Sequence, residues 1–130
     1  MTPQELLEDT IAYYSVNPAE RRCKAIIGSC HYSPKTANKP TSDGCAIGRH
    51  LSDEVKEKFD FRGGSIYFIK KYALELFALA PQWMQDMDID FLRNIQGLHD
   101  VSDFWNETGL SQEGKECVEQ IKNKFGFYFK

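Results

Sequence analysis

Serine and threonine side chains stand where helical patterns begin, and they divide the chain into segments. Thr2 is followed three residues later by Glu5, which is the spacing of a capping box. Serines precede three further helical patterns, at Ser52, Ser65 and Ser111. A hydroxyl in this position accepts a hydrogen bond from an amide of the first turn. The spacing therefore predicts that most of the chain is helical.

Helical spacing of apolar residues, or acidic residues in a first turn, marks the five helices that we expect: 3–14, 53–59, 66–79, 89–98 and 112–125. The third segment is apolar on most of its surface until Pro81 ends it. We expect it to form the buried centre of the fold. The expected fold class is mainly α (α+β), a compact bundle of about five helices.

The segment between the first two helices has a different pattern. The run Lys24–Gly28 is short and apolar, and the loop 33–44 that follows is rich in turn-forming residues. The loop ends in Asp43-Gly44, a strong turn signal. We therefore expect a short β-hairpin or extended element around residues 24–46, and then a short helix over 45–51.

Composition excludes several classes of protein. The chain has 130 residues, which fits a single domain, 1–130. A net charge of −3 is not the electrostatic footprint of a nucleic-acid-binding protein. The most apolar stretch is interrupted by charges, so no membrane span is expected. The acidic N-terminal segment has no signal core, so we expect a cytoplasmic protein with reduced thiols.

Cys45 is the first candidate for chemistry. It opens the expected short helix, where the helix dipole and nearby Arg49 would lower the pKa of its thiol. His99 could then serve as the base, with Asp100 or Asp103 orienting its ring. The alternative interpretation makes Cys45 a small core residue and His99 a partner of its own helix end, and this is the more common situation.

Two further site types have weaker signals. Cys23, Cys30, His31, Cys45 and His50 are enough ligands for zinc, but they lack a Cys-x-x-Cys pair, so neither a metal nor another cofactor is expected.

Arginines at Arg49, Arg62 and Arg93, with the Gly63-Gly64-Ser65 turn, suggest an anion site. This turn lacks the full phosphate-binding fingerprints, which favours a hinge with solvated cations.

A resemblance to a known group joins these motifs. The chain contains Cys30-His31-Tyr32, then Gly44-Cys45-Ala46-Ile47-Gly48, Ser52-Asp53-Glu54, Gln96-Gly97-Leu98-His99-Asp100 and finally Trp105. In this order it resembles a group of small, mostly uncharacterised proteins of phage and bacterial genomes, over residues 23 to 125. Arg49-His50 stands where many of those proteins have apolar or cysteine residues.

The resemblance implies both a spatial cluster and a biological setting. It implies that the following residues come together in space: Cys30, Cys45, Gly48, Gln96, His99 and Asp100. It also implies a mobile-element context, in which small accessory proteins counter host defence or modulate host enzymes.

We therefore expect a phage-type accessory binding protein whose partner is a host protein or a nucleotide-like small molecule. Its pocket is predicted to contain Tyr32, Arg49, His50, Gln96, His99 and Trp105. One alternative is a cysteine-dependent hydrolase or transferase that uses Cys45, His99 and Asp100. Another is a homo-oligomer formed through the apolar tail Phe127–Phe129, which could also pack as a strand within its own chain.

Overall fold

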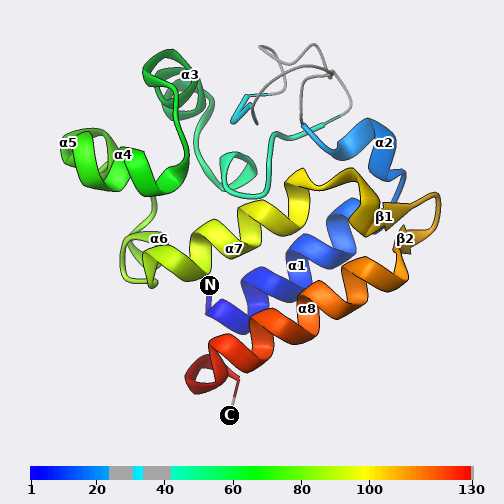
Figure 1. Cartoon of the computed structure of the whole chain (residues 1–130). Coiled ribbons are helices and arrows are strands. Elements are labelled where there is room, and N and C mark those ends of the chain that lie inside the picture. The colour runs from blue at the N-terminus through cyan, green and yellow to red at the C-terminus, as the bar shows by residue number, and fades with distance from the viewer. Residues whose placement is uncertain (24–30, 34–41, 130) are drawn as a thin grey trace.

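The computed structural model describes residues 1–23, 31–33 and 42–129 (Figure 1). Three long helices lie side by side and form the centre of the fold: α1 (Pro3–Ser15), α7 (Ile89–Asp100) and α8 (Gln112–Lys124). The shorter helices α3 (Asp53–Arg62), α4 (Ile66–Tyr72), α5 (Leu74–Phe77) and α6 (Gln82–Gln85) extend from the other side of α7. The structure confirms a mainly helical, compact fold.

Shorter elements connect these helices. A one-turn helix α2 (Pro18–Arg21) follows α1, and a 3-10 helix η1 (Gly48–His50) precedes α3. After α7 the chain forms a 3-10 helix η2 (Ser102–Phe104) and the strands β1 (Trp105–Asn106) and β2 (Gly109–Leu110). A last 3-10 helix, η3 (Gly126–Tyr128), follows α8. In the described residues, each helix is too short or too polar to cross a membrane.

The predicted helix caps are confirmed. The Thr2 hydroxyl accepts from the Glu5 amide, and the Glu5 carboxylate accepts from the Thr2 amide, which completes the capping box. The hydroxyls of Ser52, Ser65 and Ser111 each accept from the amide three residues later. Each cap satisfies one of the amides that a helix start leaves without a partner.

The core lies between the three long helices and extends beneath α3 and α4. One face of α7 is fully buried, and its apolar side chains there are Phe91, Leu92, Ile95 and Leu98. α1 contributes Leu6, Leu7 and Tyr14, and α8 contributes Val118, Ile121 and Phe125. The burial of these side chains is the main favourable term in the stability of the fold.

The expected single helix over 66–79 is wrong. Ala73 has φ −138° and ψ 54°, so the helix breaks there into α4 and α5. Ile66, Ile69 and Phe77 are buried, but several other apolar residues of this segment are exposed. These residues are exposed because apolar side chains lie on all sides of the segment, whereas the neighbouring elements cover only one of its faces. It is therefore not the buried centre of the fold, and α7 is.

A short β-hairpin joins η2 to α8. Trp105 pairs with Leu110 and Asn106 with Gly109, in antiparallel register. The Asn106 side chain accepts from the amide and hydroxyl of Thr108, and Gly109 adopts a φ of +139°, which favours glycine.

Only part of the segment 24–46, where a hairpin is expected, belongs to the residues that the structure describes. Residues 24–30 and 34–41 lie outside the described residues, and the described parts of this segment contain no strand. The short helix expected over 45–51 is a turn followed by η1. This turn, and not a strand, is the structure that brings the segment against α7.

The C-terminal tail packs on its own chain as a 3-10 helix and not as a strand. The Phe91 ring contacts Tyr128 and Phe129, with ring centroids 5.1 and 6.1 Å away. The Tyr128 hydroxyl accepts from the Asp88 amide at 2.9 Å. Phe127 is the exposed apolar residue of this segment.

Candidate functional site

His99 stands at the centre of a buried polar network. Its ring is fully buried, and its Nε2 lies 2.9 Å from the backbone nitrogen of Cys23. A backbone amide can only donate, so Nε2 is the acceptor. The proton of the neutral ring is then assigned to Nδ1, which lies 2.7 Å from Asp100 Oδ1 and donates to it.

Gln96 joins this network to the turn that contains Cys45. Its Nε2 donates to Asp100 Oδ1 at 2.8 Å, and its Oε1 accepts from the Ile47 amide at 3.3 Å. Within the turn, the Gly48 amide donates to the Cys45 sulfur at 3.3 Å. The structure therefore brings together the segments of Cys45, Gly48, Gln96, His99 and Asp100. Cys30 lies outside the described residues.

The two glycines of this turn are required by a close approach to Tyr32. A Cβ at Gly44 would lie 2.3 Å from the Tyr32 carbonyl oxygen, and a Cβ at Gly48 would lie 2.2 Å from it. The Asp60 carboxylate accepts from the amides of Tyr32 and Ser33, at 2.7 and 2.8 Å. Residues 31–33 are thus held between the turn and α3.

The six residues of the predicted ligand pocket lie in different surroundings. Tyr32 is buried against Phe59, and Gln96 and His99 are buried in the network. Trp105 lines a cavity that Asn17 and Arg22 also line.

Arg49 and His50 belong to a separate cluster on α1. The Arg49 guanidinium pairs with Asp9 and lies over the Tyr13 ring, 4.0 Å from its centroid. His50 Nε2 is 3.5 Å from Asp9 Oδ2, and its ring meets Trp83 edge to face. Burial, and then the nearby charge of Arg49, lower the pKa of His50 from 6.5 to about 4. The histidine is therefore neutral at pH 7.

The surroundings of Cys45 are not those of an activated cysteine. Cys45 is fully buried and precedes a three-residue 3-10 helix, so the expected activation by a longer helix does not apply. Both ring nitrogens of His99 are engaged, with Cys23 and with Asp100. Asp103 is exposed on η2. Within the described contacts, His99 acts as a structural group between two backbone segments.

Arg22 is the cation that this network positions. Its Nε donates to the His99 carbonyl at 2.6 Å, and its Nη2 donates to the Asp100 carbonyl at 2.8 Å. Its Nη1 lies 3.4 Å from the Ser102 hydroxyl. These carbonyls belong to the last turn of α7, which carries partial negative charge. Burial lowers the pKa of Arg22, while the Asp100 carboxylate opposes this shift. The guanidinium stays charged.

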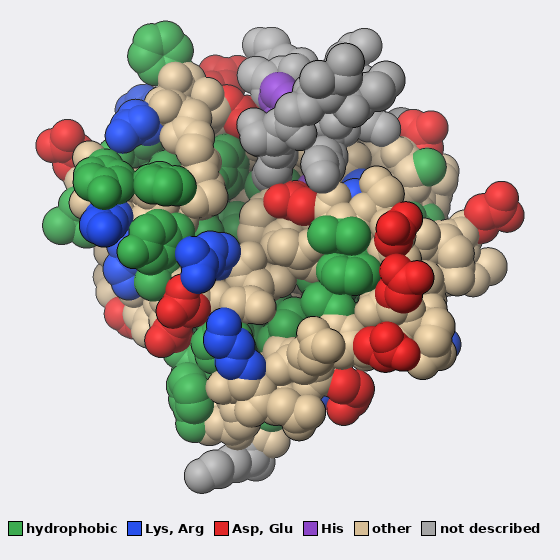
Figure 2. Space-filling model, viewed as in Figure 1, with side chains coloured by type: hydrophobic (Ala, Val, Ile, Leu, Met, Phe, Trp, Pro, Cys, Tyr) green, Lys and Arg blue, Asp and Glu red, His purple; other side chains and the backbone are tan. Residues whose placement is uncertain are grey.

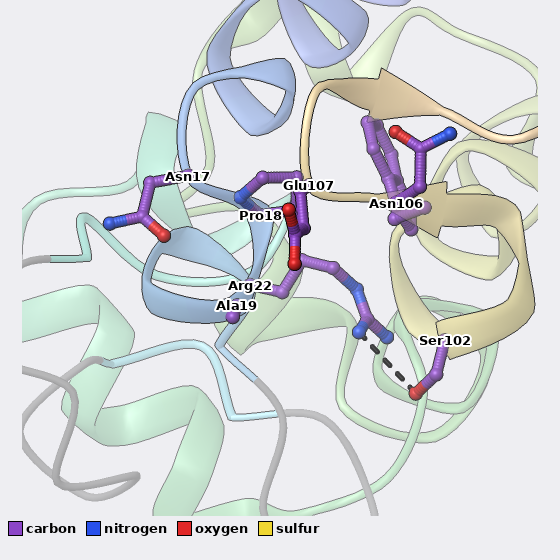
Figure 3. A pocket seen from close by; sticks show the side chains of 8 residues that line it. Asn17, Pro18, Ala19, Arg22, Ser102, Asn106 and Glu107 are labelled. Atoms are coloured by element: carbon purple, nitrogen blue, oxygen red, sulfur yellow. Dashed lines mark hydrogen bonds between the residues drawn. The ribbon is translucent and has the colours of Figure 1, made fainter.

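A pocket of about 310 Å³ lies beside this guanidinium, and we name it the Arg22 pocket (Figure 3). It is lined by Asn17, Pro18, Ala19, Arg22, Ser102, Trp105, Asn106 and Glu107. These residues come from α2 and the residues on either side of it, from η2 and from the hairpin. The Trp105 indole is fixed by a hydrogen bond of 2.8 Å from its Nε1 to the Leu98 carbonyl. The pocket therefore has one cationic wall and one rigid aromatic wall.

Sequence reasoning missed Arg22 because its partners are distant backbone carbonyls. Arg21, Arg22 and Lys24 appear in the sequence only as a short basic group. No local motif indicates that Arg22 reaches residues 77 and 78 positions later. A signal does exist at the other end, where Trp105 follows the Gln96–Asp100 motif at a fixed short distance.

In the described part of the chain, no three His, Cys, Asp or Glu side chains gather closely enough to hold a metal ion. No family model, no curated protein and no solved structure matches this chain.

Proposed function

We propose that this protein is a small binding protein, and that it holds an anionic small molecule of nucleotide-like chemistry in the Arg22 pocket. The observation that carries the proposal is the fixed guanidinium of Arg22 at the wall of this cavity. The buried network of His99 and Asp100 then has a role without catalysis, because it presents the carbonyls that hold Arg22 in place.

The guanidinium has donors for an anion. Three of its five N–H groups donate to protein acceptors in the described residues, and the other two can donate to an oxyanion. A phosphate or carboxylate held there gains a charge-assisted hydrogen bond from a half-buried guanidinium. It would also offset the penalty that burial places on the positive charge of Arg22.

The remaining walls suit a small ring-containing molecule. Pro18 and Trp105 are buried and present apolar surface, while Asn17, Asn106 and Glu107 carry polar groups at the more exposed edge (Figure 3). A volume of about 310 Å³ is at the lower end of the range for ligand pockets. Nucleoside monophosphates have the required anion, flat ring and hydroxyl groups. Glu107 can accept hydrogen bonds from those hydroxyls, and the side-chain nitrogen of Asn106 can donate to the ligand.

The buried state of Cys45 and the engaged nitrogens of His99 weigh against the cysteine enzyme. The phage setting and a role in countering host defence rest on the sequence resemblance alone. They remain part of the proposal as the context in which binding of a nucleotide-like signal would be useful.

The test is protein-observed NMR and calorimetry with a panel of nucleoside monophosphates, cyclic nucleotides, ribose 5-phosphate and inorganic phosphate. At least one nucleotide should bind and shift the amides of residues 17–22 and 102–107, and phosphate alone should bind more weakly. An unchanged spectrum across the panel would overturn the proposal, as would shifts confined to other residues.

Variants at the wall test the contacts while sparing the core. Asn106→Ala and Glu107→Gln change exposed side chains and should each weaken binding. Arg22→Lys keeps the charge but loses the planar fork, and should weaken binding more. The matched control is Arg93→Gln, because Arg93 is an exposed arginine of α7 that does not line this pocket. Equal affinity in all four variants would contradict the assignment of the site.

A further inference from the structure

Exposed apolar side chains gather on α3, α4 and α5. Nine large apolar residues are exposed in the described part of the chain, and five of them lie between positions 61 and 79. They are Phe61, Phe68, Tyr72, Leu74 and Leu79, and Phe61 has 96% of its surface exposed. Figure 2 shows apolar and cationic side chains together over these helices. Single exposed apolar residues are ordinary, but a clustered set marks an interaction surface.

The aromatic residues of this surface are ordered and accompanied by cations. The rings of Phe68 and Tyr72 stack with centroids 5.9 Å apart. The Lys71 ammonium lies 5.4 Å from the Tyr72 centroid and 5.7 Å from that of Tyr67. Such contacts hold positive charge directly over the apolar surface. We call these exposed apolar residues, with Arg62, Lys70 and Lys71, the aromatic–cationic surface.

The local charge differs from that of the whole chain. The stretch 62–74 contains three cations and no acidic residue, while the chain has a net charge of −3. Arg62, Lys70 and Lys71 take part in none of the ion pairs found within the described residues. The partner that fits this charge is acidic.

The surface also has a concave part. A groove of about 670 Å³ lies between α3 and α5. Phe61 and Leu76 are its apolar lining, and Lys58, Arg62, Glu54 and Glu57 line it with two positive and two negative charges. An amphipathic helix can place apolar side chains in such a groove. A flat bilayer cannot fill it. A two-fold contact with a second copy would bring the cationic stretch 62–74 against itself, which like charges disfavour.

We infer that the aromatic–cationic surface docks an acidic amphipathic helix of another protein. This inference is independent of the Arg22 pocket, which lies on other elements. It assigns the chain a macromolecular partner in addition to a small ligand. The apolar side chains would supply most of the buried area, and the cations would select acidic partners over basic ones.

The probe is a synthetic amphipathic peptide of about five turns, with leucine and tryptophan on one face and glutamate on the other. A second peptide carries lysine in place of every glutamate. Fluorescence anisotropy should show that the full chain binds the glutamate peptide, that salt weakens the binding, and that the lysine peptide binds at least about tenfold more weakly. Amide shifts should map to residues 58–79.

Two double variants and their matched controls locate the contact. Phe61→Ser with Phe68→Ser, and Lys70→Glu with Lys71→Glu, should each lower the affinity about tenfold or more. The controls are Phe127→Ser, an exposed phenylalanine of η3, and Lys122→Glu with Lys124→Glu, exposed lysines of α8. These should leave the affinity unchanged. Circular dichroism confirms that each variant is folded.

Several results would overturn the inference. They are equal binding of the two peptides, no binding of the glutamate peptide, or equal losses in the control variants. If the protein sediments with anionic phosphatidylserine vesicles, and the double variant of Phe61 and Phe68 does not, the surface would be assigned to a membrane instead. A concentration-dependent dimer that the same variant dissolves would assign it to a second copy.

Discussion

The Nε2 atom of His99 lies 2.9 Å from the backbone nitrogen of Cys23, a residue 76 positions earlier. This hydrogen bond fixes the tautomer of the ring and directs its Nδ1 proton to Asp100. It also places Cys23 and its neighbour Arg22 at the end of α7, where Arg22 reaches the carbonyls of His99 and Asp100. A buried histidine thus joins the N-terminal third of the chain to its central helix.

Replacing His99 with alanine should lower the free energy of unfolding by about 2–4 kcal/mol. The substitution removes the acceptor of the Cys23 amide and the donor to Asp100, and it leaves a cavity in a fully buried position. Urea denaturation measures the change. Gln120→Ala, at an exposed position of α8, is the control and should change stability by less than about 0.5 kcal/mol. Equal effects of the two substitutions would contradict a structural role for His99.

Two glycine-to-alanine substitutions should have opposite signs. A Cβ at Gly48 would lie within 3 Å of three Tyr32 backbone atoms, so Gly48→Ala should destabilise the fold by about 2 kcal/mol or more. A Cβ at Gly97 would meet nothing within 4 Å, and Gly97 lies inside α7. Gly97→Ala should therefore stabilise by about 0.5–1 kcal/mol. Thermal unfolding measures both changes, and a Gly48→Ala variant as stable as the wild type would show that the turn does not approach Tyr32 as described.

Acid should destabilise the protein partly through His50. In the unfolded chain His50 takes up a proton near its ordinary pKa of 6.5, whereas in the folded protein it does so only near pH 4. Its contribution is therefore fully present above pH 6.5 and is lost as the pH falls toward 4. The loss is on the order of 2–3 kcal/mol.

The charged groups around His50 define the comparison for this test. They are Arg49, Asp9, Lys56 and the N-terminal ammonium of Met1, of which the three cations lower the pKa and Asp9 raises it. His50→Gln does not titrate, so its unfolding free energy should fall less than that of the wild type between about pH 7 and pH 4.5. Parallel pH profiles for the two proteins would contradict the shifted pKa.

Native thiol labelling should spare Cys23 and Cys45. Both are fully buried, whereas Cys117 is partly exposed. Of these three cysteines, Cys117 should react first with iodoacetamide, although slowly, because burial raises the pKa of its thiol. Peptide mass spectrometry before and after urea unfolding resolves the sites. Rapid labelling of Cys45 in the folded protein would instead favour the cysteine enzyme.

The elements that follow from local chemistry could be predicted from the sequence. The caps at Thr2, Ser52, Ser65 and Ser111 depend on neighbouring residues, and all four occur. The break at Ala73 could not be predicted, because alanine favours helix and the apolar pattern continues through it. The hairpin at 105–110 was missed because each of its strands has two residues, too few for a period-two pattern.

The residues of the candidate site could likewise be predicted only in part. The resemblance gathered Gln96, His99 and Asp100, and these residues do share hydrogen bonds. The sequence did not separate Arg49 and His50 from them, since an ion pair with Asp9 leaves no local signal. Arg22 was missed because its partners are carbonyl oxygens, which every residue has. Contacts between a side chain and distant backbone are decided by tertiary packing and not by motif.

The end of α7 depends on parts of the chain that are made at different times. Arg22, on its N-terminal side in the sequence, binds the carbonyls of His99 and Asp100, and Trp105, on the other side, binds that of Leu98. During synthesis Arg22 leaves the ribosome long before its acceptors exist, so its early segment stays hydrated until α7 has emerged. We expect a nascent chain stalled before α7 to be sensitive to protease, and one extended past α8 to gain protection in a single step.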